Sequence, residues 1–215
     1  VDYRRLESPA LEAHIGTGVF YGASVPEAQA LSGRPVVVVG GGNSAGQAAV
    51  HLARYASSVT VVVRGESLRA GMSRYLIDVL AAAPNVTVRS CARVVDAVGE
   101  GRLEGVVLED VRDGSRAVAE AAGLFVMIGA RPRTDWLPDV IGRDEGGAVL
   151  TGADVPAGRW TLERPARPLE TSVPGVFAVG DVRHGSMRRV AAAVGDGAAV
   201  MSQIHRHLET LLTTP

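Results

Sequence analysis

Residues 36–46 read VVVVGGGNSAG, and this stretch fits two different sequence motifs. The range 40–45 matches the dinucleotide-binding loop G-x-G-x-x-A, whereas the range 42–46 matches the nucleophile elbow G-x-S-x-G of serine hydrolases. Both motifs need an apolar strand before the loop and a helix after it, and the sequence supplies both. The surrounding sequence must therefore decide whether Ser44 is a nucleophile or part of a phosphate-binding loop.

The segments around this loop alternate between strand and helix patterns. β-branched runs at 36–39 and 59–63 are typical of strands buried in a parallel sheet, and apolar residues recur at helical spacing in the range 43–56 between them. A second helix is predicted to begin at Ser73, followed by a third strand at 86–88. This alternation predicts an α/β fold with a doubly wound, Rossmann-like parallel sheet.

The pattern changes in the second half of the chain. Short strand candidates between 92 and 119 are separated by the turn sequences GEGR and RDGS, which predicts an antiparallel β-meander. The range 124–128 returns to a buried-strand pattern, and one short strand at 176–179 and a helix from about 189 to 212 come after it. We predict three segments: an irregular lead-in at 1–34 with one short helix after Ser24, a nucleotide-binding domain at 35–147, and at 148–215 part of a second domain that buries no core of its own.

Composition excludes several classes of function. The 215 residues carry a formal net charge of −1 and contain no basic run, so neither nucleic acid nor a membrane surface is an expected partner. All basic residues are arginine, which excludes Schiff-base chemistry and a phosphate-loop lysine. A single cysteine, Cys91, and scattered histidines predict neither a disulfide nor a metal site. Without a signal peptide or a long apolar span, a cytoplasmic location is expected.

The residue after the second strand separates the two motifs. A dinucleotide-binding fold places a ribose-binding residue about twenty positions after the glycine-rich loop, and that position carries Arg64, with Arg69 following. An acid there would bind the 2′-hydroxyl of NAD, whereas arginines form charge-assisted bonds to the 2′-phosphate of NADP. The sequence therefore favours an NADP(H) site.

Each loop residue then has a role at this site. Gly40 allows the tight turn, Gly42 allows close approach of the pyrophosphate, and Ala45 lets the helix pack on the sheet. Asn43 and Ser44 belong to the phosphate cradle at the helix N-terminus. A serine hydrolase that uses Ser44 remains a remote alternative, since the candidate histidines, His184, His205 and His207, lack the loop context of a catalytic triad.

The order of motifs resembles the low-molecular-weight thioredoxin reductase family of two-dinucleotide flavoproteins. The matching stretches are GTGVFYGAS, VVVVGGGNSA, RGESLRA, MIGARPRT and TSVPGVFAVGD, which together span nearly the whole chain. The resemblance implies NADP(H) contacts at Ile128 and Gly129. It also implies FAD contacts at Gly180, Asp181, Arg188, Arg189 and Val190, where a helix N-terminus would face the flavin.

The sequence departs from this family in several places. Gly22 and Val25 stand where family members that reduce thioredoxin carry the C-x-x-C dithiol, so no catalytic residue is assigned in this chain. Gly65 replaces the second of the family's paired arginines, and Arg189 stands where glutamine is frequent. The family's N-terminal FAD segment is missing, so we expect a fragment that is inactive alone and does not retain FAD.

These observations lead to a functional expectation for the parent protein. We expect an NADPH-dependent flavoprotein oxidoreductase that passes hydride to FAD and electrons to an acceptor other than a dithiol, such as a small iron-sulfur or flavin protein, a quinone or dioxygen. The alternative is a non-catalytic NADP(H)-binding or sensing module. Without the FAD segment, Val190, Ala193, Val194 and the strand at 176–179 should face water or a second copy in a homodimer.

Overall fold

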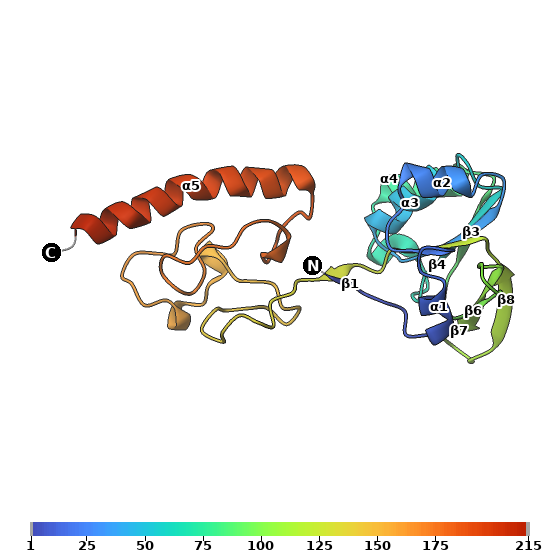
Figure 1. The fold of residues 1–215 in the computed structure, drawn as a ribbon, viewed down its shortest axis with the longest axis horizontal. Coiled ribbons are helices and arrows are strands. Elements are labelled where there is room, and N and C mark those ends of the chain that lie inside the picture. The colour runs from blue at the N-terminus through green and yellow to red at the C-terminus, as the bar shows by residue number, and fades with distance from the viewer. Residues whose placement is uncertain (1, 214–215) are drawn as a thin grey trace. The chain divides into compact units, whose positions relative to one another are not determined.

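The computed structural model describes residues 2–213, which form two compact units (Figure 1). One unit is Tyr3–Gly129, and the other comprises the residues from Ala130 onward together with Asp2. The chain passes between them at β1 (Asp2–Tyr3) and β10 (Ala130–Arg131), which form a two-stranded sheet. The compact units thus divide the chain at 129/130 and not at 147/148, and the lead-in lies in the first unit. The assignment of one nucleotide to each unit stays a prediction.

Hydrogen bonds explain why residues 130–147 belong to the second unit. The Thr134 hydroxyl donates to the Gly147 carbonyl, and the Gly142 N–H donates to the Ser172 hydroxyl oxygen at 2.7 Å. The Ser172 hydroxyl in turn donates to the Val140 carbonyl at 2.7 Å, and His184 Nδ1 lies 2.7 Å from Asp144 Oδ2. All of these partners lie beyond position 130, so the segment packs with residues later in the chain.

The first unit is built on a five-stranded parallel sheet in the order β2-β9-β3-β4-β5, in which β2 is Val19–Phe20. The predicted strands are confirmed. Their bounds are Pro35–Val39 for β3, Ser58–Val62 for β4, Val86–Arg89 for β5 and Gly123–Val126 for β9. The two predicted helices are also confirmed, as α3 (Asn43–Leu52) and α4 (Arg74–Ala82).

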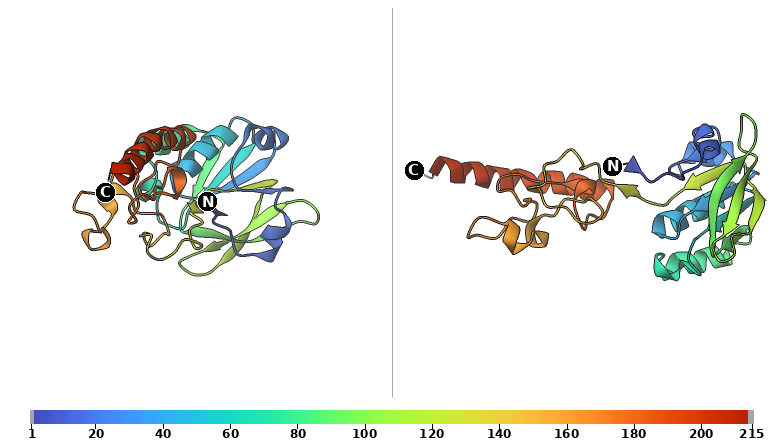
Figure 2. Two further views of the ribbon diagram at one scale, coloured as in Figure 1. Left: turned by 60° about the vertical axis from the view of Figure 1, so that its left-hand side comes forward. Right: turned by 90° about the horizontal axis from the view of Figure 1, so that it is seen from below.

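Different layers cover the two faces of this sheet (Figures 1 and 2). Helices α2 (Val25–Ala30), α3 and α4 lie on one face, where alternate strand residues such as Val38, Val61 and Phe125 form a core with them. The predicted antiparallel meander covers the other face, where it packs on Val37, Val39 and Leu124. The meander strands are β6 (Ala92–Val98), β7 (Gly105–Asp110) and β8 (Arg116–Glu120). A meander therefore takes the place of helices on the second face of this Rossmann-like sheet.

The lead-in is more regular than its sequence predicts. The predicted helix after Ser24 is present as α2 (Val25–Ala30), but α1 (Pro9–Ala13) and β2 (Val19–Phe20) were not expected. Strand β2 extends the sheet beside β9, and the Phe20 ring stacks on Phe125 at 5.3 Å between centroids. These elements are too short to show a hydrophobic period, and tertiary packing stabilises them.

The second unit has little regular structure apart from α5 (Val190–Thr213), which confirms the predicted C-terminal helix (Figure 1). The predicted strand at 176–179 is wrong. Instead, the Thr171 N–H donates to the Val176 carbonyl at 2.8 Å and the Ala178 N–H to the Leu169 carbonyl at 3.0 Å, around a turn at Gly175. In the described part of the chain, both large clusters of buried apolar residues lie in the other unit.

Several apolar side chains of α5 are exposed. Val190 is 83% exposed and Val194 is 68% exposed, as expected, whereas Ala193 is half-buried against Gly180. Among the described residues, no helix is both long enough and apolar enough to cross a membrane. Within the same residues, no group of three His, Cys, Asp or Glu side chains is placed to hold a metal ion.

Candidate nucleotide-binding site

The loop after β3 is fixed by the strands on both sides of it. The Gly40 N–H donates to the Val62 carbonyl of β4 at 3.1 Å. Gly40 has φ +146°, and a Cβ built there would lie 2.5 Å from the Met127 carbonyl oxygen and 3.0 Å from the Ala45 Cβ. Position 40 therefore requires glycine both for its backbone conformation and for its close packing.

The N-terminus of α3 is left open by its capping residue. Gly42 caps the helix with no side-chain hydrogen bond, and a Cβ at Gly42 would meet only the Gly71 carbonyl oxygen, at 3.8 Å. Ala45 is fully buried beneath the loop, whereas Asn43 and Ser44 are exposed. With no side-chain oxygen on the first-turn N–H groups, this helix end suits an anion such as a pyrophosphate.

The loop after β4 carries the two predicted arginines. Arg64 and Arg69 are both exposed, and neither guanidinium forms an ion pair with any carboxylate in the part of the chain that the structure describes. Arg69 lies in a short 3₁₀ helix, Leu68–Ala70, whose Leu68 side chain is buried in the core. Both guanidinium groups are therefore available to an external anion.

Three contacts join this loop to the glycine-rich loop. The Ser73 N–H donates to Asn43 Oδ1 at 2.7 Å. A Cβ at Gly71 would lie 3.0 Å from the Gly41 carbonyl oxygen, and a Cβ at Gly46 would lie 2.8 Å from the Met72 sulfur. Sequence reasoning missed these contacts and took Asn43 only as a cofactor ligand. The glycines at 46 and 71 were the available signal, since each allows close approach of the opposite loop.

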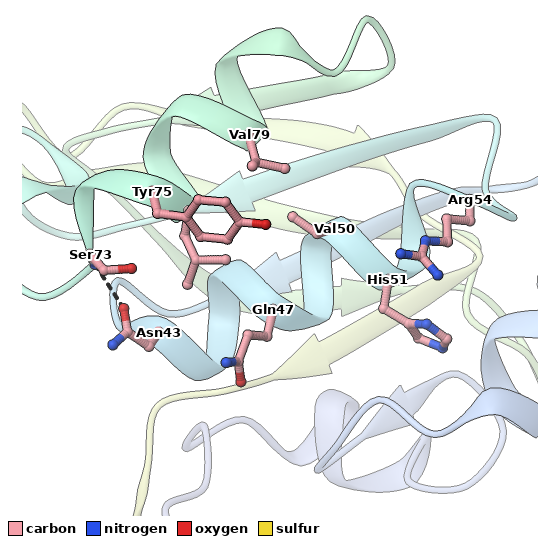
Figure 3. A pocket seen from close by; sticks show the side chains of 9 residues that line it. Asn43, Gln47, Val50, His51, Arg54, Ser73, Tyr75 and Val79 are labelled. Atoms are coloured by element: carbon pink, nitrogen blue, oxygen red, sulfur yellow. Dashed lines mark hydrogen bonds between the residues drawn. The ribbon is translucent and has the colours of Figure 1, made fainter.

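A pocket of about 350 Å³ lies beside these contacts, between α3 and α4 (Figure 3). Asn43 and Ser73 form one end of it, Arg54 the other, and Val50, Leu76 and Val79 are its apolar residues. The side chain of Tyr75 is also part of its lining and is 73% exposed. Apart from Asn43, none of the residues that line this pocket is predicted from the sequence to bind a ligand.

The remaining predicted NADP(H) residues lie at the same edge of the sheet. Ile128 and Gly129 follow β9, which neighbours β3 and ends beside it with Val126 opposite Val39. Gly129 has φ +92°, and its carbonyl accepts a hydrogen bond from the Arg4 N–H at 2.9 Å. The first unit thus places all predicted NADP(H) positions after the carboxyl ends of β3, β4 and β9, where open α/β sheets bind ligands.

The predicted FAD residues cluster in the second unit. Gly180 has φ +69°, its N–H donates to Asp196 Oδ2 at 3.1 Å, and its missing Cβ would lie 3.2 Å from the Ala193 Cβ of α5. Asp181 follows it, and its carboxylate forms no ion pair within residues 2–213. The structure therefore brings Gly180 and Asp181 against the start of α5.

The predicted FAD contacts at the entrance to α5 are open to solvent. Arg188 has a left-handed backbone at φ +49°, and its guanidinium donates to the Ala130 carbonyl at 3.5 Å. Arg189, directly before α5, and Val190, its first residue, are both exposed. All three positions are exposed to solvent, and their role in FAD binding stays a prediction.

The histidines do not support a catalytic serine. Ser44 makes no hydrogen bond to a histidine in the described part of the chain. His184 Nδ1 lies 2.7 Å from Asp144 Oδ2, in the unit that does not contain Ser44. Burial raises the pKa of Asp144, but His184 and the N–H groups of Ala148 and Gly146 lower it by more. His207 packs on Gly175 and the Phe177 ring.

Comparison with known proteins identifies the family. A family model described as pyridine nucleotide-disulphide oxidoreductase matches residues 4–197. The chain belongs to this family. The resemblance to thioredoxin reductases is confirmed, because thioredoxin reductase of Lactococcus lactis superposes with a TM-score of 0.80 at 26% identity, covering 97% of this chain and 64% of that chain. The enzyme of T. acidophilum gives a TM-score of 0.77 at 27% identity, covering 97% and 63%.

Sequence relatives agree with the structural ones. The chain is 34% identical over 202 residues to a 34.2 kDa protein in the rubredoxin operon of Clostridium pasteurianum, a match over 93% of this chain and 60% of the relative. It is 31% identical over 196 residues to an alkyl hydroperoxide reductase component of Staphylococcus aureus, over 91% and 35%. The chain thus spans less than two thirds of the length of each of these oxidoreductase-family relatives.

Proposed function

We propose that this chain provides the NADPH site and part of the FAD site of an oxidoreductase that passes hydride from NADPH to FAD. The proposal is carried by the open N-terminus of α3 at Gly42 and by two arginines on the next loop at the same edge of the sheet. These arginines, Arg64 and Arg69, have no ion-pair partner in the described part of the chain. Backbone N–H groups would bind the pyrophosphate, and the arginines would bind the 2′-phosphate.

The FAD half of the proposal rests on the second unit. Asp181 is available to hydrogen-bond a ribityl or phosphate group, and the first turn of α5 offers N–H groups to the flavin. When bound, the flavin supplies the chemistry of accepting hydride and releasing electrons. The role of this chain is to bind and orient the flavin. The chain spans less than two thirds of the length of the proteins it matches, which agrees with an FAD site to which further protein contributes. The chain alone is then inactive and does not retain FAD.

The acceptor is proposed to differ from that of a dithiol enzyme. The only cysteine, Cys91, is buried and lies at the junction between β5 and β6, while Gly22 and Val25 carry no sulfur. Electrons would leave to a small iron-sulfur or flavin protein, a quinone or dioxygen. A relative encoded in a rubredoxin operon supports the first of these.

Equilibrium binding of NADPH and NADH to this chain tests the nucleotide assignment. The double variant Arg64→Ala, Arg69→Ala should lose about 1.5 to 3 kcal/mol of NADPH binding per charge-assisted hydrogen bond removed, and NADH binding should not change. Arg102→Ala is the matched control, because Arg102 is an exposed arginine in the meander and pairs with Glu104. Equal weakening for both nucleotides would contradict the proposal.

The flavin assignment needs a separate measurement on the full-length protein. A visible flavin absorption band, present after purification or after reconstitution with FAD, is expected. A full-length protein that binds NADPH but neither carries nor takes up FAD would instead be the NADP(H)-sensing module.

A further inference from the structure

The hydrogen bond between Asn43 and Ser73 joins two segments that are thirty positions apart in sequence. Asn43 is the first residue of α3, directly after the glycine-rich loop, and Ser73 caps α4 at the end of the loop that carries Arg69. Figure 3 shows this bond as the dashed line at one end of the pocket. The side-chain amide oxygen of Asn43 therefore points to the neighbouring loop and has a hydrogen-bond partner within the protein.

The segment 67–73 has few other ties at this end. Leu68 and Met72 anchor it from below by burial, and the Ser67 hydroxyl accepts from the Arg69 N–H at 3.4 Å within the segment itself. The Ser73 N–H joins this segment to the glycine-rich side by its hydrogen bond to Asn43 Oδ1. Gly71 packs closely against Gly41 without a hydrogen bond. Asn43 Oδ1 therefore accepts a hydrogen bond that joins the Arg69 segment to the N-terminus of α3.

Resting on the proposed function, we propose that Asn43 is a positioning residue for recognition of the 2′-phosphate. Its side chain acts on Arg69 through Ser73, by holding the Arg69 segment against the phosphate-binding end of α3. A bound nucleotide spans both loops, so the distance between them sets whether one ligand reaches the helix N-terminus and the arginine together. Loss of the hydrogen bond between Asn43 and Ser73 should reduce the preference for a 2′-phosphate and not only the overall affinity.

Two small probes separate these effects. Binding of 2′,5′-ADP and of 5′-AMP is measured by calorimetry on the chain, and the ratio of their dissociation constants defines the 2′-phosphate preference. Asn43→Ala should lower this preference about fivefold, the change expected for the loss of one neutral hydrogen bond. Asn43→Asp keeps an oxygen acceptor for the Ser73 N–H, so hydrogen exchange of residues 67–73 should stay as in the native chain. Gln47→Ala, at an exposed position one turn further along α3, is the control and should leave the preference unchanged.

A variant on the other side of the bond gives an independent readout. Ser73 has φ −61°, which suits proline, so Ser73→Pro removes the N–H donor and leaves Asn43 intact. It should lower the preference as Asn43→Ala does, and hydrogen exchange of residues 67–73 should accelerate in both variants. If the native chain prefers 2′,5′-ADP but Asn43→Ala weakens both probes equally, the positioning role is overturned. If the native chain shows no preference, the NADPH assignment itself is wrong.

Discussion

Glu170 offers a quantitative test of what holds the second unit together. Its carboxylate is fully buried and accepts hydrogen bonds from the Arg164 guanidinium at 2.7 and 2.9 Å and from the N–H groups of Arg167 and Gly175, each at 3.0 Å. Burial by itself raises the pKa of Glu170, but Arg164 and the two N–H groups outweigh it and lower the pKa from 4.5 to about 2. The charged form is therefore the stable one in the folded unit.

The shift converts into a stability contribution with a defined pH window. Because the folded pKa is depressed, the contribution is fully present above the unfolded value near 4.5 and is lost as the pH falls toward 2. At about 1.4 kcal/mol per pKa unit, the charge of Glu170 contributes about 3 kcal/mol to the free energy of unfolding at neutral pH. Glu170→Gln should lose about this amount at pH 7, since a glutamine amide cannot accept from all four donors.

Urea unfolding followed by tryptophan fluorescence measures this directly. Both tryptophans lie in the second unit, and the Trp160 ring stands 5.2 Å from the Arg164 guanidinium carbon that pairs with Glu170. Between pH 5 and pH 2 the native protein should lose stability more steeply than Glu170→Gln. Glu163→Gln, at an exposed position nearby, is the control and should follow the native protein. Parallel pH profiles for the native protein and Glu170→Gln would refute the electrostatic account.

Two further predictions concern the first unit. Gly42→Ala should leave the thermal unfolding temperature nearly unchanged, because the new Cβ meets only the Gly71 carbonyl oxygen, at 3.8 Å. The same variant should abolish binding of NADPH, because the Cβ obstructs the pyrophosphate. Retained binding would contradict the proposed site. Phe125→Ala should lower the free energy of unfolding by about 3 to 5 kcal/mol, because Phe125 is fully buried and stacks on Phe20. Urea unfolding monitored by far-UV circular dichroism measures this. The control Val118→Ala, at a position 67% exposed, should change the free energy of unfolding by less than about 0.5 kcal/mol.

Much of the first unit could be predicted from the sequence, because its signals are local. Four consecutive β-branched residues before a glycine-rich loop are enough to identify β3, and the turn sequences of the meander identify its hairpins. Strand β2 could not be found in this way. Its two residues, Val19 and Phe20, form a strand only because β9 lies beside them, and no window of the sequence contains that information.

The candidate site shows the same division. The positions of Gly40, Gly42 and Arg64 follow from spacing along a strand-loop-helix-strand unit, and the structure places them at one sheet edge. The bond from Ser73 to Asn43 depends on how α4 packs against α3, which spacing does not determine. Sequence reasoning therefore found the residues that face a ligand and missed the bond that holds their loops together.

The difference between the predicted boundary at 147/148 and the division into compact units at 129/130 has a related physical cause. After β9 the sequence continues through Gly129 and Pro132 without any change in composition, so a boundary at 147/148 looked as good as an earlier one. The side chains of this segment nevertheless find their partners later in the chain, as His184 does for Asp144 and Ser172 for Gly142. A segment belongs to the unit in which its buried polar groups are satisfied, since leaving them unpaired would cost more than an irregular backbone does. Domain membership here is decided by hydrogen bonds spanning thirty or more positions, whereas the phosphate-binding loop is decided within six.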